Sequence, residues 1–237
     1  MCGRFTLVDL SQFTDLFPWI RPPEQFAPRY NIAPSQPILV ALGDARGYSF
    51  QHVLWGLVPQ WARDASGSSR MINARSETVA EKPAFAAAFR YHRALVPASG
   101  FYEWKATSRG KTPVYITRRD GKPMILAGMC DSWHDPAGGE LRSGAILTTA
   151  ANGDLRGVHD RMPVILEPDS AGRWLTTPPE RAREVLDLLR PAADGLLAVQ
   201  AVSSAVNSPA RQGPELIMPC SPAGGDPQSS LPSLFPL

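Results

Sequence analysis

The second residue, Cys2, offers the most unusual chemistry in the sequence. Once the initiator Met1 is removed, Cys2 carries a free α-amine and a thiol on adjacent carbon atoms. An α-amine has a reference pKa of about 7.7–8.0 and a Cys thiol one of about 8.5, so both are partly nucleophilic near neutral pH. A lysine amine, at about 10.4, is not nucleophilic there unless it is buried. Cys2 therefore predicts nucleophilic chemistry at the chain terminus.

The residues after Cys2 indicate that this terminus is held in the fold. The run Phe5-Thr6-Leu7-Val8 has the apolar and polar alternation of a β-strand. A frayed chain end does not usually show such a pattern, because it has no packing partner. We therefore expect the chain to begin with a strand that presents Cys2 for reaction.

Three later stretches combine polar, charged and aromatic residues in short motifs. They are residues 73–77, 100–104 and 159–163, which read Asn-Ala-Arg-Ser-Glu, Gly-Phe-Tyr-Glu-Trp and His-Asp-Arg-Met-Pro. Taken alone, Glu103 is more often an exposed residue at a strand end, and an asparagine such as Asn73 is common in turns. With Cys2 in view, Glu103 is better interpreted as a general acid and base. His159 differs from the other histidines in the Asp-Arg pair that follows it.

The composition is that of an ordinary folded protein. Of the 237 residues, 43% are hydrophobic and 19% charged, which suits one or two domains with an apolar core. No apolar run approaches the roughly 18–20 residues of a membrane span, and there is no secretory signal, so we expect a cytoplasmic protein. The three cysteines fit reduced thiols, not a disulfide framework. His and Cys spacing does not indicate a metal site, no glycine-rich loop indicates nucleotide hydrolysis, and no cofactor is expected.

The charge of the chain gives only weak information about partners. The net charge is +2, which does not by itself indicate a nucleic-acid-binding protein. Arginines outnumber lysines by 20 to 4, and arginine suits bidentate phosphate recognition. The 24 prolines and 19 glycines suggest that a genome-wide compositional bias explains most of this excess.

Short strands and few helices, without a β-α-β rhythm, predict an α+β fold. We expect mostly antiparallel sheets that form a barrel-like core with short flanking helices. Residues 1–219 should form a single domain, and residues 220–237, rich in Gly, Ser and Pro, a flexible tail. Expected helices are 10–17, 84–91 and a third that starts at 177–180 and ends before Pro191; expected strands are 5–8, 38–42, 48–54, 95–104, 113–117, 124–128, 145–150 and 196–202.

Taken together, the motifs resemble those of the SOS-response-associated peptidase (SRAP) family. The resemblance runs from Met1 to about Pro219 and includes residues 29–34 (Arg-Tyr-Asn-Ile-Ala-Pro) and 206–209 (Val-Asn-Ser-Pro). Five or six motifs in the same order are specific, although each alone is weak. The resemblance implies that Met1 is removed and that Cys2 captures abasic sites in single-stranded DNA. Its amine would form an imine with the C1′ aldehyde of the opened sugar, and its thiol would close a thiazolidine ring.

The resemblance also implies roles for the other motif residues. In the catalytic set, Glu103 shuttles protons, His159 hydrogen-bonds the sugar ring oxygen, and Asn73 orients the lesion beside Cys2. Arginines would hold phosphates, although taken alone they also fit surface ion pairs. Tryptophans would stack on bases, although they could equally be core residues, as we expect for Trp133 and Trp174. The expected DNA contacts are Arg4, Asn31, Arg75, Arg161, Trp55, Trp61 and Trp104, with no metal ligand among them.

Two other functions stay open at the level of sequence. The first is a cysteine peptidase with an N-terminal nucleophile, in which the amine of Cys2 or His159 acts as base. Self-cleavage that removes Met1 would be a limited form of this activity. The second is a non-covalent single-strand DNA-binding module in which Cys2 is incidental. In the leading interpretation the partner is abasic single-stranded DNA, including single-strand to double-strand junctions. The protein is then expected to be a monomer that joins the nucleoid when bound to DNA.

Overall fold

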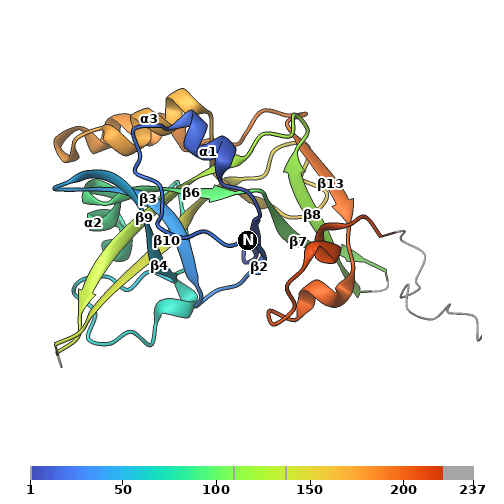
Figure 1. Ribbon diagram of the computed structural model, residues 1–237, viewed down its shortest axis with the longest axis horizontal. Helices are drawn as coiled ribbons and strands as arrows, with labels where there is room; N and C mark the ends of the chain where they lie inside the picture. The colour runs from blue at the N-terminus through green and yellow to red at the C-terminus, as the bar shows by residue number, and fades with distance from the viewer. Residues whose placement is uncertain (1, 109, 137, 221–237) are drawn as a thin grey trace, which may run out of the picture.

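The computed structural model describes residues 2–108, 110–136 and 138–220, and it is built mainly of strands (Figure 1). The expected tail therefore lies outside the described residues, apart from Cys220. The strands are β1 (Phe5–Leu7), β2 (Arg29–Ile32), β3 (Pro37–Asp44), β4 (Gly47–Trp55), β5 (Asn73–Arg75), β6 (Arg93–Ala98), β7 (Gly100–Thr107), β8 (Gly110–Arg118), β9 (Met124–His134), β10 (Glu140–Ala150), β11 (Arg161–Pro163), β12 (Ile165–Leu166) and β13 (Leu197–Ala201).

Five of these strands close into a barrel. Strand β10 pairs with β4, β4 with β3, β3 with β6, β6 with β9, and β9 again with β10. Among these pairs only β4 and β10 run parallel, and β5, β11 and β12 extend the barrel along β10 and β9. Closure leaves no unpaired edge among the five strands. The predicted α+β class with a barrel-like, mostly antiparallel core is confirmed.

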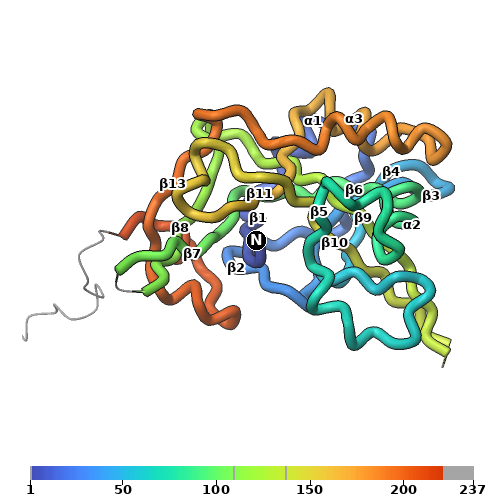
Figure 2. The backbone as a smooth tube through the Cα atoms, turned by 180° about the vertical axis from the view of Figure 1, so that it is seen from behind, coloured from blue at the N-terminus to red at the C-terminus, as the bar shows by residue number. Residues whose placement is uncertain are grey.

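A second sheet lies beside the barrel and holds the start of the chain. Its strand order is β13-β8-β7-β1-β2, and every pair that joins them is antiparallel (Figures 1 and 2). In β1, Phe5 lies opposite Ile32 of β2 on one edge and opposite Phe101 of β7 on the other. The ring of Phe5 also contacts Trp55, the last residue of barrel strand β4, edge to face at 5.1 Å. The expected N-terminal strand is confirmed.

The predicted strand 95–104 is two strands that belong to different sheets. Strand β6 lies in the barrel and β7 in the second sheet, and the chain changes sheet at Ser99, whose backbone N–H donates to Thr6 O. The run of apolar residues gave no sign of this break, since Ser99-Gly100 also fits within a strand. Gly100 is required here because a Cβ atom would lie 2.5 Å from the ring of Tyr115. The change of sheet moves Glu103 out of the barrel and next to β1.

Short helices cover the outside of the barrel near β6 and β9 (Figure 1). The helix expected at 84–91 is confirmed, while the one expected after residue 177 is a 3₁₀ helix, with tighter i→i+3 hydrogen bonds. The helix at 168–176 was not expected, because Gly172 interrupts its apolar pattern. The helices are α1 (Ser11–Leu16), α2 (Pro83–Tyr91) and α3 (Pro168–Thr176), with 3₁₀ helices η1 (Ser68–Arg70), η2 (Pro179–Leu188), η3 (Ser204–Asn207) and η4 (Pro214–Ile217).

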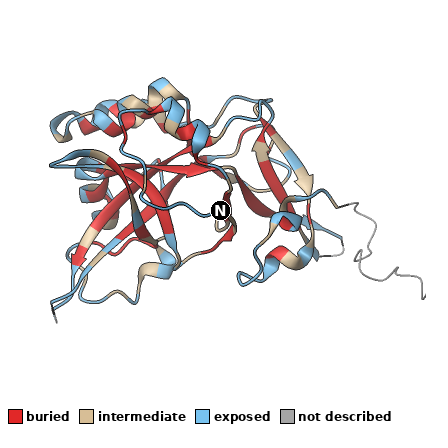
Figure 3. Cartoon of the chain, in the orientation of Figure 1, coloured by how far each residue is buried: buried red, intermediate tan, exposed pale blue. Residues whose placement is uncertain are grey.

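The strands of both sheets are largely buried, and the apolar side chains between them form a continuous core (Figure 3). Trp133 and Trp174 are 7% and 0% exposed, so the expectation that both are core residues is confirmed. No helix of the described ranges is long and apolar enough to cross a membrane. This core contains residues of both the barrel and the second sheet, and Cys2 is one of them.

A single buried cation joins the C-terminal ends of α2 and α3. Arg93, 6% exposed, donates through Nη1 to the carbonyl oxygens of Phe89 and Arg90, and through Nε and Nη2 to those of Trp174 and Thr177. The last carbonyl groups of a helix have no partner within the helix, and the helix dipole is negative at that end. The guanidinium charge is therefore balanced by two helix ends.

We expect Arg93→Met to destabilise the protein strongly. The substitution keeps an apolar side chain of similar length but leaves four carbonyl oxygens without their donor. Each buried unpaired acceptor costs about 1–3 kcal/mol, so the free energy of unfolding in urea should fall by more than about 2 kcal/mol. Arg183→Met, on the exposed side of η2, is the matched control and should change it by less than about 0.5 kcal/mol. Equal small effects of the two substitutions would contradict this role of Arg93.

Candidate functional site

The backbone of Cys2 is bound to the edge of the barrel. Asn73 is the first residue of β5, which runs parallel to β10 with Asn73 opposite Ile146. From this position the side-chain Nδ2 of Asn73 donates to the carbonyl oxygen of Cys2 at 2.8 Å. Its Oδ1 is buried and accepts no hydrogen bond from the part of the chain that is described. Asn73 therefore fixes Cys2 and keeps one acceptor atom for another group.

Glu103 approaches Cys2 from the second sheet. The pairing of β1 with β7 continues beyond the strand ends, since the backbone N–H of Tyr102 donates to Arg4 O at 2.9 Å. Glu103 is the next residue of β7 and is 5% exposed. Its negative charge acts on the Cys2 thiol. The structure thus brings together Cys2, Asn73 and Glu103, three of the four residues that were predicted to be catalytic.

Burial and a nearby negative charge both favour the neutral form of the Cys2 thiol. Burial, followed by the charge of Glu103, raises the pKa of the Cys2 thiol to about 12. A nucleophilic thiolate needs the opposite environment, with nearby positive charge that lowers the pKa. Nucleophilic attack by the thiol alone is therefore disfavoured, and the sulfur is better suited to a step in which it also gives up its proton.

His159, the fourth predicted catalytic residue, lies on a loop beside the end of β10. A helical turn forms the loop, in which the backbone N–H of His159 donates to Leu155 O at 3.0 Å. The imidazole Nδ1 accepts a hydrogen bond from the backbone N–H of Arg161 at 2.9 Å, and it lies 2.6 Å from Asp160 Oδ1. Strand β11 begins immediately afterwards and pairs with the same end of β10 that pairs with β5 (Figure 2).

Arg4, two residues after Cys2, forms a hydrogen-bonded cluster with Asn31. Arg4 Nη1 donates to Asn31 Oδ1 at 2.6 Å and to Val206 O at 2.8 Å, while its guanidinium group lies 5.7 Å from the ring centroid of Trp104. Burial lowers the pKa of Arg4. Asn31 is 0% exposed, and its Nδ2 donates to the carbonyl oxygens of Val206, Ser208 and Arg211.

This cluster corrects the expectation that Asn31 contacts DNA. A fully buried amide whose oxygen and nitrogen both have protein partners offers no atom to a ligand. Asn31 instead holds Arg4 and the segment 206–211 in place. The Nη1 atom of Arg4 is bound by acceptors within the protein. The role of Arg4 as a phosphate ligand stays a prediction.

The three tryptophans expected to stack on bases have different surroundings. Trp55 is 0% exposed and donates from Nε1 to Ile72 O, so it belongs to the core and offers no face for stacking; here the expectation was wrong. Trp61 is 65% exposed, on the segment that follows β4. Trp104 is half-buried and donates from Nε1 to Asn207 Oδ1 at 2.8 Å. Trp61 and Trp104 remain candidates.

The two arginines near β5 also differ in accessibility. Arg75, the last residue of β5, is exposed. Arg161 is 14% exposed in its side chain and pairs with Glu77, with Nη1–Oε1 at 2.5 Å and Nη2–Oε2 at 2.9 Å. Its guanidinium group forms an ion pair in this structure, and its role as a DNA contact stays a prediction. Glu77 was not predicted as a site residue, although an acidic residue two positions after Arg75 in the same motif was an available signal.

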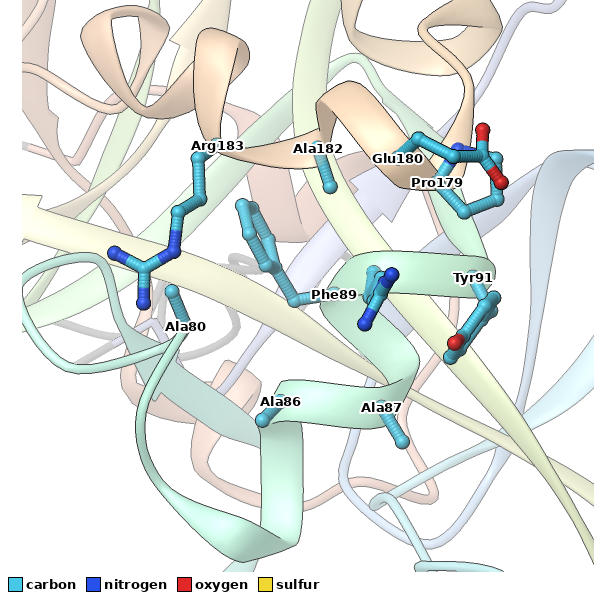
Figure 4. A pocket seen from close by; sticks show the side chains of 10 residues that line it. Ala80, Ala86, Ala87, Phe89, Tyr91, Pro179, Glu180, Ala182 and Arg183 are labelled. Carbon is cyan, nitrogen blue, oxygen red and sulfur yellow. The ribbon is translucent and has the colours of Figure 1, made fainter.

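The described residues, those of the site included, show no grouping of three or more His, Cys, Asp or Glu side chains that would suit a metal ion. A groove between α2 and η2 is lined by small and aromatic side chains and by two arginines, Arg90 and Arg183, of which Figure 4 shows Arg183 at one side. It contains none of the predicted site residues. Within the described part of the molecule, the motifs that are distant in sequence come together around Cys2.

Comparison with known proteins gives concordant matches. The family profile described as SOS response associated peptidase (SRAP) matches residues 1–209. Abasic site processing protein YoqW of Bacillus subtilis (strain 168) is 39% identical over 92% of this chain and 99% of its own length. Abasic site processing protein YedK of Escherichia coli (strain K12) is 32% identical over 81% of this chain and 84% of its own. A crystal structure of a Bordetella bronchiseptica protein, 28% identical, superposes with a TM-score of 0.74 over 85% of this chain and 100% of that one.

Alkylation should reveal the raised pKa of the Cys2 thiol. At pH 8 we expect iodoacetamide to modify Cys2 more than about 100-fold more slowly in the folded protein than in urea, because only the thiolate reacts. Glu103→Gln removes one cause of the shift and should speed the reaction, but not to the unfolded rate, since burial is the larger cause. Peptide mapping reads each cysteine separately. Cys130, whose pKa burial also raises to about 12, is the internal control. An unchanged Cys2 rate in Glu103→Gln would contradict the electrostatic contact.

Proposed function

Because the chain belongs to the SOS response associated peptidase family, we propose that it processes abasic sites in single-stranded DNA by forming a covalent bond through Cys2. The curated relatives that match it over most of its length are named abasic site processing proteins. The observation that carries the proposal is the hydrogen bond from Asn73 to Cys2 O, together with the action of the Glu103 charge on the same residue.

The proposed reaction joins the terminal amine and the thiol to one carbon atom. The α-amine of Cys2 attacks the C1′ aldehyde of the ring-opened sugar to give a carbinolamine, which loses water to become an imine. The thiol then adds to the imine carbon, and its proton passes to the nitrogen. The products are a five-membered thiazolidine and one water molecule. Glu103 accepts a proton from the attacking amine and returns it to the departing hydroxyl group.

His159 and Asn73 have supporting roles in this proposal. His159 hydrogen-bonds the ring oxygen of the closed sugar and favours opening to the aldehyde. Asn73 holds the backbone of Cys2 and offers its buried Oδ1 to a hydroxyl group of the lesion. Positioning of this kind lowers the entropic cost of bringing the reacting atoms together.

The order of the two nucleophiles follows from their protonation. A thiol whose pKa is raised to about 12 is not a competing first nucleophile at neutral pH, whereas an α-amine is partly unprotonated there. An imine alone is reversible and promotes elimination of the 3′ phosphate. Ring closure by the thiol removes the electron-accepting C=N bond and so halts that elimination.

Contacts to the DNA backbone complete the proposal. Arg75 is exposed two residues after Asn73, where it can bind a phosphate beside the lesion, and Arg4 is the second candidate. Trp61 offers an exposed aromatic face to unpaired bases. Such contacts read charge and stacking, not base edges, so binding should depend on salt and not on sequence.

The peptidase function is a weaker alternative. It requires a Cys2 thiolate, which burial and the charge of Glu103 both disfavour. The removal of Met1, which both functions need, concerns a residue outside the described ranges. Intact mass of the purified protein tests that requirement directly.

The first test separates the two nucleophiles on one abasic oligonucleotide. Wild-type protein should lack Met1, gain the mass of the DNA less one water, and give a heat-stable adduct without reductant. Cys2→Ala keeps the terminal amine, so it should give an imine that borohydride traps and that proceeds to strand cleavage. One extra residue before Cys2 converts the amine to an amide and should abolish both products.

Two results would contradict this order of events. A heat-stable adduct from the extended protein would show that the thiol acts alone. The absence of a trapped imine with Cys2→Ala would show that the thiol starts the reaction, and the peptidase function would regain support.

Trp61→Ala should weaken binding to single-stranded DNA. Loss of one stacking contact costs about 1–3 kcal/mol, which is a 5- to 150-fold increase in Kd, measured by fluorescence anisotropy. Trp19→Ala is the matched control, because Trp19 is 45% exposed but packs against Tyr48 near the opposite end of the barrel. Similar losses for both variants would indicate a general effect on the surface and not stacking at Trp61.

A further inference from the structure

The Glu77–Arg161 ion pair joins the two chain segments that carry the polar residues of the site. Its two parallel N–H···O bonds are charge-assisted and geometrically specific. The Arg161 Nη2 atom also donates to Thr148 O at 2.6 Å. The guanidinium group lowers the pKa of the Glu77 carboxyl group below its ordinary value. The Arg161 side chain is 14% exposed and the Glu77 side chain 49%, so the arginine end of the pair is shielded from solvent while the carboxylate end is partly screened.

The pair connects β5 and β11 across the strand that lies between them. Thr148 of β10 is opposite Arg75 of β5 on one side and opposite Pro163 of β11 on the other. Glu77 follows β5 by two residues, and Arg161 is the first residue of β11. The side chain of Arg161 therefore crosses the end of β10 and closes a link between the segment of Asn73 and the loop of His159.

Arg161 also contacts the imidazole of His159, through its own backbone N–H group. His159 Nδ1 accepts from the backbone N–H of Arg161 at 2.9 Å and lies 2.6 Å from Asp160 Oδ1. An Nδ1 atom without a proton accepts from the N–H, whereas an Nδ1 atom with a proton donates to the carboxylate. One nitrogen cannot do both, so these two partners compete for it. The Asp160 side chain is 85% exposed, so water competes with its contact.

We propose that the Glu77–Arg161 ion pair is a positioning device for His159: it holds the backbone N–H of Arg161 on Nδ1, and the proton of the neutral imidazole is thereby placed on Nε2. In the neutral form with Nδ1 as acceptor, and equally in the imidazolium form, Nε2–H is a donor. Only the alternative neutral form, with Nδ1–H on Asp160, leaves Nε2 as a base. The ion pair thus makes His159 a hydrogen-bond donor towards the substrate.

The consequence for catalysis depends on the proposed function. A donor at Nε2 suits a residue that hydrogen-bonds the sugar ring oxygen and favours ring opening, whereas a base at that atom does not. Arg161 and Glu77 are then positioning residues, since they act through His159. A competing assignment makes Arg161 a phosphate ligand that leaves Glu77 when DNA binds. The two assignments predict opposite effects of removing the Glu77 charge.

The test compares four full-length variants with the wild-type protein. Glu77→Gln removes the charge and keeps the shape, Asp160→Asn removes the competing carboxylate, and the double exchange Glu77→Arg with Arg161→Glu restores an ion pair with its ends reversed. Glu184→Gln is the matched control, because it breaks the exposed Arg181–Glu184 pair, whose N···O distance is 2.6 Å. Thermal unfolding of each variant verifies that the fold is retained.

Three readouts distinguish positioning from phosphate binding. Long-range ¹H–¹⁵N spectra report which imidazole nitrogen of His159 carries the proton, with His159→Gln used for assignment. The crosslinking rate at saturating abasic single-stranded DNA reports catalysis. Affinity for the same DNA with a tetrahydrofuran analogue, which has no aldehyde, reports binding, and its salt dependence counts phosphate contacts.

We expect wild-type His159 to carry its proton on Nε2 when neutral, and Asp160→Asn to leave this form and the rate unchanged. Glu77→Gln should mix the two neutral forms and slow crosslinking by about 10-fold, which is less than the 10²–10⁴-fold effect of a complete loss of proton transfer. Its affinity and salt slope should not change, Glu184→Gln should match wild type, and the double exchange should recover part of the rate.

Several results would overturn the proposal. One is a wild-type His159 that carries its proton on Nδ1. Another is a Glu77→Gln protein with unchanged spectra and rate. A third is tighter binding of the tetrahydrofuran DNA by Glu77→Gln, with a salt slope steeper by about 0.7, the value for one more phosphate on a single strand. If wild type forms no adduct while the spectra agree with expectation, the proposed function fails and the positioning of His159 stands.

Discussion

Strand β1 is hydrogen-bonded along both of its edges, to β2 and to β7, and this pairing decides where the start of the chain lies. Chain ends are ordinarily mobile, because few contacts hold them. Here the ring of Phe5 also packs against Trp55 of the barrel, and Asn73 binds the carbonyl group of Cys2. A terminal amine next to such a strand is held in place like a side chain. The chemistry proposed for Cys2 depends on this restraint.

The site combines a buried thiol with a buried carboxyl group, whose residues are 0% and 5% exposed. Both Cys2 and Glu103 are buried, so the charge of Glu103 is screened little and acts on the proton of the Cys2 thiol. In the proposed reaction a protonated thiol adds only after an imine has formed beside it, whereas a low-pKa thiolate would react with many electrophiles. Selectivity for a substrate with a free aldehyde then comes from the order of the two steps.

Much of the fold and of the site was predictable from the sequence, because local patterns specify local structure. Strand alternation located β3 and β4, and the motif residues Cys2, Asn73 and Glu103 do meet. What the sequence did not reveal depends on tertiary contacts. Trp55 has the residue type of a stacking group, but β1 covers it. The change of sheet at Ser99 and the partner of Arg161 both arise from strands that are adjacent in space and not in sequence.

The distribution of the site along the chain also has a consequence for biosynthesis. Cys2 leaves the ribosome first, but the strand that carries Glu103 follows only about a hundred residues later, which takes on the order of 5–20 s at 5–20 residues per second. Until β7 and β5 are available, the amine and thiol are ordinary exposed groups of an unfolded chain. The unfolded nascent chain therefore exposes these groups to metabolite aldehydes during this interval, before the fold places Cys2 beside Asn73 and Glu103.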